Sequence, residues 1–174
     1  KSAEDALRAS EARLDAAAEL AGLGFYETDY EERTAYLDAR LRDLLGVPQG
    51  PEQDLRQVAF FLERVHPDDA PQFLEKRQSL HEGRLERAAM EHRYVHPERG
   101  VRWMLHVARV AARDEEGRAR RGYGVLRDIT ERREHEAALR QSLDEIGRLK
   151  DRLQAESDYL RAEIQGTQVR SELT

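Results

Sequence analysis

The chain of 174 residues contains no cysteine. Disulfide bonds, thiolate metal sites, cysteine nucleophiles and a cysteine-linked flavin are therefore excluded. No apolar run approaches the roughly 20 residues of a membrane-spanning helix, and no signal peptide is present, so we expect a cytoplasmic protein. Aromatic residues make up only 6% of the chain, and all four phenylalanines and the single tryptophan lie within residues 22–130. That segment can bury a core, whereas the two ends need partners.

Neither sign of charge is in large excess. The chain has 29 Lys and Arg against 35 Asp and Glu, interspersed, which gives a formal net charge of −6. No basic stripe indicates nucleic-acid binding, so none is expected. A glycine-rich phosphate loop is also missing, and we predict no catalytic core in this segment. Because the sequence begins at Lys1 and ends in a hydrophilic tail, we expect it to belong to a longer protein.

Residues 22–130 alternate short β-patterned runs with short helical ones. The predicted strands are 25–30, 34–37, 87–96, 101–113 and 119–129. The predicted helices are 38–46, 54–65 and 69–83, with a Pro- and Gly-rich loop at 48–53. This order predicts an α+β domain with a five-stranded antiparallel sheet and short helices on one face.

Apolar and polar residues alternate in the fourth predicted strand. Its apolar row is Val101, Trp103, Leu105 and Val107. We expect this row to face the core, because one face of such a sheet is buried. His106 belongs to the opposite row and is expected on the outer face.

Both ends of the chain predict amphipathic helices. Residues 1–21 carry small apolar residues at helical spacing, and residues 131–166 carry Leu and Ile in heptads. We expect a parallel homodimer through the N-terminal helix and a C-terminal coiled coil. An intramolecular hairpin is the alternative, although no turn signal interrupts the heptads. Gly166 is expected to end the helix and leave a frayed tail at 167–174. The predicted interface residues are Leu7, Leu14, Leu139, Leu143, Ile146, Leu153, Leu160 and Ile164.

The last β-patterned run passes into the long helical pattern without a break. Asp128 with Glu131 fits a helix-capping box, and Thr130 is a second candidate cap. A strand joined directly to a helix transmits displacement. We therefore interpret Asp128, Ile129 and Thr130 as a signal relay.

Three spaced motifs resemble one known family. Asp128-Ile129-Thr130 is followed by Glu131-Arg132, and Arg102-Trp103 and His66-Pro67-Asp68-Asp69 precede it. The combination is similar to PAS sensor domains with their C-terminal PAC motif, over residues 21–133. The resemblance implies the same five-stranded fold. It also implies that the stretch at 66–69 is scaffold rather than a metal or acid–base site.

The candidate ligand-pocket residues are His92, Trp103, Leu105, Val107 and Leu126. A buried His92 could ligate heme or hydrogen-bond a small ligand, but a satisfied core histidine is the more common outcome. PAS relatives that sense blue light through flavin use a cysteine and a polar amide on the last strand. Here Leu126 stands at the corresponding position, so only non-covalent flavin binding stays open. The sequence requires no cofactor and no metal.

These features predict the sensory module of a signal-transduction protein. A change caused by a ligand or partner would pass through the relay to the coiled coil and to a downstream output domain. Residues 149–164 are similar to linkers in sensor histidine kinases of two-component systems and in activators of the alternative sigma factor. The kinase is favoured as the commoner attachment. A dimerisation scaffold without ligand is the rival from another class.

Overall fold

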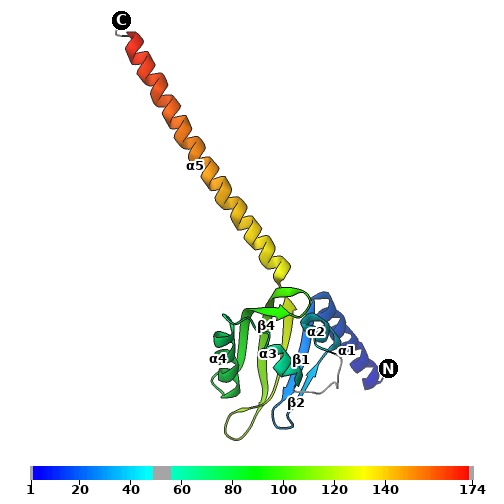
Figure 1. Cartoon of the computed structure of the whole chain (residues 1–174). Coiled ribbons are helices and arrows are strands. Elements are labelled where there is room, and N and C mark those ends of the chain that lie inside the picture. Colours follow the sequence, from blue (N-terminus) through cyan, green and yellow to red (C-terminus); the bar gives the residue numbers. More distant parts are fainter. Residues whose placement is uncertain (1, 49–55, 173–174) are drawn as a thin grey trace. The chain divides into compact units, whose positions relative to one another are not determined.

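The computed structural model describes residues 2–48 and 56–172 (Figure 1). The chain divides into two compact units between Thr130 and Glu131. In the described residues, the first unit contains a sheet with four helices, and the second consists of one helix.

The sheet is antiparallel throughout, and its strands lie in the order β2-β1-β5-β4-β3. The strands are β1 (Leu23–Asp29), β2 (Thr34–Leu37), β3 (Arg87–His96), β4 (Gly100–Arg113) and β5 (Ala119–Asp128). The last strand therefore occupies the centre of the sheet, between β1 and β4. The predicted α+β fold with a five-stranded antiparallel sheet is confirmed.

The helices of the first unit are α1 (Ala3–Leu20), α2 (Ala39–Leu45), α3 (Arg56–Leu62) and α4 (Ala70–His81). Asp38 caps α2, because its side chain accepts a hydrogen bond of 2.6 Å from the Leu41 backbone nitrogen. Gly46 ends α2 at a φ of +64°, a conformation that glycine adopts without a Cβ penalty. The predicted loop at 48–53 and the predicted start of α3 fall largely outside the described residues.

The core fills the space between one face of the sheet and helices α2, α3 and α4. Its most buried large side chains are Tyr94, Leu41, Leu45, Met104 and Leu126. The Tyr94 hydroxyl donates a hydrogen bond of 2.8 Å to the Leu45 carbonyl oxygen, so the polar atom in this apolar region is satisfied. Helix α1 has no fully buried residue.

The row of β4 that faces the core is not the predicted one. The buried residues are Met104, His106 and Ala108, and the partly buried residues of the opposite row are Trp103, Leu105 and Val107. Both rows carry apolar residues, so alternation alone does not identify the inner face. The prediction of His106 on the outer face was wrong for the same reason.

Helix α5 (Thr130–Glu172) forms the second unit from Glu131 onward. It continues through Gly166, where the sequence predicted its end. One glycine costs a helix only about 1 kcal/mol relative to alanine, which the neighbouring turns can tolerate. The heptad residues Leu139, Leu143, Ile146, Leu153, Leu160 and Ile164 are exposed in the single chain. Within residues 2–48 and 56–172, no helix is long and apolar enough to span a membrane.

Candidate functional site

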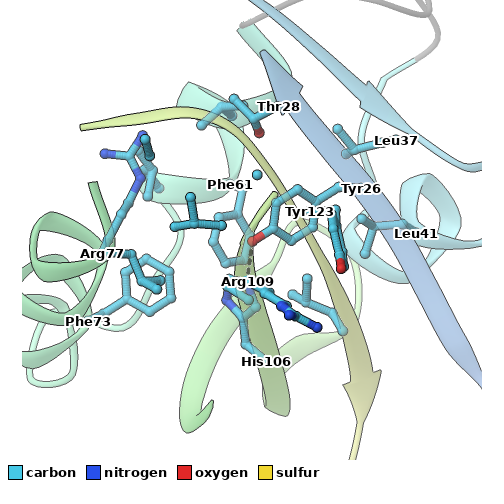
Figure 2. A pocket seen from close by; sticks show the side chains of 18 of the residues that line it. Tyr26, Thr28, Leu37, Leu41, Phe61, Phe73, Arg77, His106, Arg109 and Tyr123 are labelled. Atoms are coloured by element: carbon cyan, nitrogen blue, oxygen red, sulfur yellow. Dashed lines mark hydrogen bonds between the residues drawn. The ribbon is translucent and has the colours of Figure 1, made fainter. Parts of the chain in front are cut away.

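A cavity of about 90 Å³ lies in the first unit between the sheet and helices α2, α3 and α4 (Figure 2). Six of the residues that line it are Tyr26, Thr28, Phe73, Arg77, His106 and Leu126. Most of the lining is apolar, and the polar groups come from few side chains. This is the composition typical of a small-molecule site.

Small residues on the central strands β4 and β5 make room for the cavity and for the Tyr26 ring beside it. The pairing of β4 with β5 places Ala108 opposite Gly124, and the pairing of β5 with β1 places Gly124 opposite Tyr26. A Cβ at Gly124 would come within 2.7 Å of the Tyr26 ring, so only glycine lets the tyrosine lie across this strand.

Tyr26 and His106 form a buried polar pair. Tyr26 Oη and His106 Nε2 share a hydrogen bond of 2.9 Å, and the two rings meet edge to face. Burial raises the pKa of Tyr26 and, with a smaller contribution from nearby His92, lowers the pKa of His106 to about 3. Both groups are therefore neutral at ordinary pH.

His92 lies beside this pair. Its ring packs against the rings of Phe73 and Phe61, with centroid distances of 4.8 Å and 5.8 Å. The centroid of the His106 ring lies 5.9 Å away. Neither His92 nitrogen has a hydrogen-bond partner among the described residues. Burial lowers its pKa to about 4. His92 faces inward, as the sequence predicted, and supports the wall of the cavity through the aromatic rings.

The predicted pocket residues divide into two groups. Leu126 lines the cavity and His92 contacts residues that line it. Trp103, Leu105 and Val107 lie on the opposite face of the sheet and do not line it. Sequence reasoning missed Tyr26, Arg77 and His106. Alternation along the first and fourth strands could have found Tyr26 and His106 only with the inner face already known.

The cavity does not fit a flavin or a heme. An engineered cavity that holds benzene measures about 150 Å³, and both cofactors are several times larger than benzene. The cavity of about 90 Å³ would have to expand greatly to admit either one. Leu126, where the resemblance places a polar amide for flavin, offers no hydrogen bond. In the described ranges, no cluster of three or more His, Asp or Glu side chains could hold a metal ion.

The end of β5 is fastened to β4 by three contacts within the first unit, and a fourth is local to the junction. Arg102 pairs with Asp128 at 2.8 Å, and the Thr130 backbone nitrogen donates to Asp128 Oδ1 at 2.8 Å. The Trp103 backbone nitrogen donates to Thr130 Oγ1 at 2.9 Å, and the Ile129 nitrogen donates to the Trp103 carbonyl at 2.8 Å. Burial alone would raise the pKa of Asp128, but hydrogen bonds from Thr130 and Arg102 outweigh it and lower the pKa.

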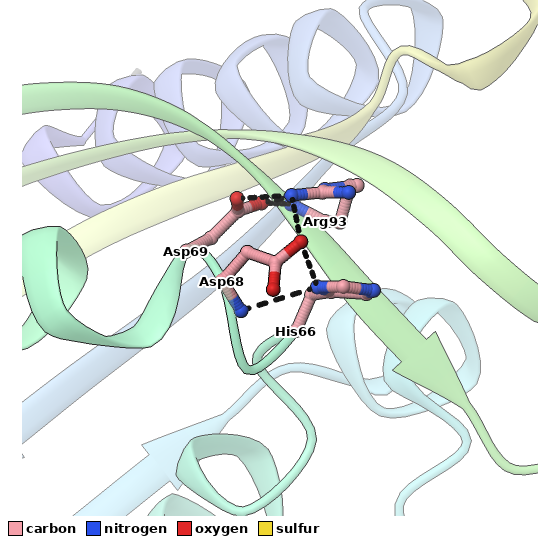
Figure 3. A network of polar contacts seen from close by, with 4 residues as sticks. All are labelled: His66, Asp68, Asp69 and Arg93. Atoms are coloured by element: carbon pink, nitrogen blue, oxygen red, sulfur yellow. Dashed lines mark hydrogen bonds and ion pairs between the residues drawn. The ribbon is translucent and has the colours of Figure 1, made fainter.

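The stretch from His66 to Asp69 is fastened to β3 (Figure 3). Asp69 stands immediately before α4, which begins one residue later than the predicted helix, and its side chain does not cap the helix. It accepts hydrogen bonds from the Arg93 backbone nitrogen and guanidinium, both at 2.7 Å. Hydrogen bonds from the Arg93 side chain lower the pKa of Asp69 to about 2, against the opposing effect of burial. This geometry anchors the loop before α4 to β3, and His66 Nδ1 lies 3.6 Å from the Asp68 carboxylate in the same stretch.

Comparison with known proteins places this architecture. No curated protein matches the sequence significantly. A sensory box histidine kinase/response regulator from Burkholderia thailandensis E264 is similar in structure, with a TM-score of 0.63 and 24% identity over 78% of this chain and 98% of that one. The N-terminal domain of a diguanylate cyclase with PAS/PAC sensor from Marinobacter aquaeolei has a TM-score of 0.52 and 20% identity, over 64% of this chain and 98% of that chain.

A third similar structure is an RNA-binding light-oxygen-voltage receptor, with a TM-score of 0.51 and 22% identity over 71% of this chain and 33% of that one. At such identities, the three structures show a shared fold. The family model of the PAS fold matches residues 34–126, which is more than half of the sequence. With its five-stranded sheet, its cavity between sheet and helices and the tied end of β5, this chain belongs to the PAS fold family.

Proposed function

We propose that this chain is the sensory module of a cytoplasmic signal-transduction protein. A ligand or partner acts on the cavity, the change passes through Asp128, Ile129 and Thr130, and a paired α5 carries it to an output domain. The proposed organisation is an N-terminal helix at 1–21, a sensor body at 22–130 and a coiled coil over residues 131–166 of α5.

One observation carries this proposal. Strand β5 contributes Leu126 to the cavity wall, and only two residues later Asp128 forms the contacts that tie the strand end to β4. Helix α5 begins at Thr130 without an intervening loop. A movement of β5 caused by filling the cavity therefore reaches the start of the helix over four residues. Such a relay works only if the ligand binds two states of the module unequally.

Dimerisation supplies the second element of the mechanism. Leu7 and Leu14 are exposed on α1, and the α5 residues Leu139, Leu143, Ile146, Leu153, Leu160 and Ile164 are exposed at heptad spacing. Exposed apolar residues at this spacing are typical of helices that pair in a parallel coiled coil. Pairing of two chains would bury them and give the relay an element with two discrete arrangements.

We infer a sensor histidine kinase as the output, with a sigma-factor-dependent activator as the alternative. The similar Burkholderia structure is named as a histidine kinase/response regulator, and the Marinobacter structure as part of a diguanylate cyclase. The name of the Marinobacter structure makes a diguanylate cyclase a third output to be tested. Activity measurements on the parent protein distinguish the three.

A ligand-free interaction scaffold is the second candidate. Trp103, Leu105 and Val107 are partly exposed on the outer sheet face, and an apolar face of this kind can bind protein. Native mass spectrometry of the purified chain separates the candidates. A bound metabolite supports the sensor, whereas an empty cavity that no small molecule fills supports the scaffold.

The relay itself is tested by Asp128→Ala in the parent protein. This change removes the ion pair with Arg102 and the hydrogen bond from Thr130, and should uncouple the stimulus from the output while fold and dimer persist. Unaltered stimulus dependence of the output in this variant would count against the relay.

A further inference from the structure

Two cationic side chains line the cavity, Arg77 of α4 and Arg109 of β4, and of the two Arg77 is the partly buried one. Arg77 of α4 lines the cavity and is half-buried, yet it makes no hydrogen bond or ion pair with the described residues. Other arginines of the unit, such as Arg93 and Arg102, pair with carboxylates. A guanidinium that is partly removed from water without a partner is unfavourable, so its place favours an incoming anion.

Arg77 and His106 lie toward different ends of the cavity, and the Arg77 charge still acts on Tyr26. Phe73, one helical turn before Arg77, packs 5.6 Å from the His106 ring. Figure 2 shows the Arg77 side chain extending from α4 away from His106, toward the end where Thr28 lies. The lining is therefore cationic toward Thr28 and apolar in between, and its other end combines the neutral Tyr26–His106 pair with the exposed Arg109 of β4 (Figure 2).

The stretch between the two ends is built for a short hydrocarbon chain. It is bounded by Ala108, Leu80, Leu126 and Phe73. Scaling from the cavity of about 150 Å³ that holds six-carbon benzene, about 90 Å³ accommodates roughly three or four carbon atoms. None of the described residues that line the cavity is Asp or Glu, so no carboxylate there repels an anion.

We propose that the cavity binds a short-chain monocarboxylate. The carboxylate pairs with the Arg77 guanidinium, whose planar fork matches two carboxylate oxygens. The tail lies over Ala108 toward Leu126 and Tyr26. This inference rests on the proposed function, namely that the cavity takes a ligand, and it names the chemical class of that ligand.

The test is an NMR titration of the whole ¹⁵N-labelled chain with butyrate and with butyramide, its neutral analogue of the same shape. Butyrate should produce saturable shifts at Leu126, Tyr26 and the Arg77 side-chain Nε–H. Butyramide should bind at least about tenfold more weakly, because it cannot form the charged pair. Decanoate, whose chain exceeds the cavity, should produce no saturable shifts at these positions.

Substitutions at Arg77 test whether the carboxylate binds to this side chain. Arg77→Gln should weaken butyrate binding at least about tenfold and leave butyramide binding unchanged. Arg77→Lys keeps the charge but loses the planar fork, so its affinity should lie between those of the wild type and Arg77→Gln. Arg87→Gln is the matched control, since Arg87 is exposed on β3 and does not line the cavity. It should leave both affinities unchanged.

Several results would overturn the assignment. Equal affinities for butyrate and butyramide, or full butyrate affinity in Arg77→Gln and Arg77→Lys, would show that the cavity does not select a carboxylate, while the proposed sensor would stand. Absence of saturable shifts with butyrate would also contradict the assignment of a carboxylate ligand. The sensor function would then be judged separately, by whether a cavity-filling substitution alters the pairing of α5.

Discussion

His92 and His106 illustrate how burial at the residue scale sets the behaviour of the whole unit toward acid. Burial lowers the pKa of His92 to about 4 and that of His106 to about 3, from an ordinary value near 6.5. Below about pH 6.5 the unfolded chain takes up protons at these positions and the folded chain does not. The contribution of the two histidines to the free energy of unfolding should therefore be greatest above that pH and fall as the pH drops toward 4.

Each neutral buried histidine contributes a slope of about 1.4 kcal/mol per pH unit in this window. Urea unfolding between pH 7 and 5 measures how the free energy of unfolding depends on pH. His92→Leu should reduce this slope by the contribution of one histidine. His135→Gln, at an exposed position on α5, is the control. An identical slope in wild type and His92→Leu would contradict this explanation.

Gly124→Ala should destabilise the first unit by about 1–3 kcal/mol, the usual effect of overpacking. The new Cβ would lie 2.6 Å from the Val107 carbonyl oxygen and 2.7 Å from the Tyr26 ring, so strand or ring must shift. Chemical denaturation followed by Trp103 fluorescence reports the change. Gly147→Ala is the control, since nothing lies within 4 Å of the added Cβ. A midpoint equal to that of wild type in Gly124→Ala would mean that the tyrosine is not fixed there.

Residue roles were only partly predictable from the sequence. The placement of His92 followed from alternation in a strand where its row is clearly more apolar, and Leu126 was proposed from the PAS resemblance. His106 was misplaced because its own row, with Met104 and Ala108, is as suited to burial as the row of Trp103. Arg77 was missed because an arginine on a short amphipathic helix is usually solvated, and only the cavity shows what it faces.

At the scale of elements, turn and cap chemistry made the sequence informative. Gly46 and the loop at 97–100 end elements where predicted, and β3 occupies the predicted residues 87–96. The strand order could not be predicted from local pattern, because placing β5 between β1 and β4 depends on contacts distant in sequence. The end of α5 was misplaced because a helix tolerates one glycine such as Gly166.

Leu153→Asp combined with Leu160→Asp should weaken dimerisation, because both side chains are exposed at the same heptad position and would bring carboxylates into the seam. Sedimentation equilibrium should show a lower average molecular mass than that of the wild type. Gln141→Asp with Ala155→Asp adds the same charge at positions away from the seam and serves as the control. An unchanged mass in the leucine double variant would place the interface elsewhere.

At the scale of the whole molecule, the proposed mechanism connects a cavity to a helix through one strand end. The Asp128 carboxylate accepts bonds from Arg102 of β4 and from Thr130 at the start of α5, so its loss removes one contact to the neighbouring strand and one to the helix start. The proposal requires that filling the cavity and breaking this contact act on the same pair of states. Cavity filling and relay disruption should therefore be non-additive.

The most direct test measures α5 in the dimer while the cavity is changed. Because the chain has no cysteine, Gln141→Cys allows one spin label per chain. Double electron–electron resonance then gives the distance between the labels of the two chains in the dimer. Ala108→Leu, which fills the cavity, should shift the distance distribution, and adding Asp128→Ala should abolish that shift. A distribution that does not respond to Ala108→Leu, or a shift that persists in the Asp128→Ala background, would contradict the account.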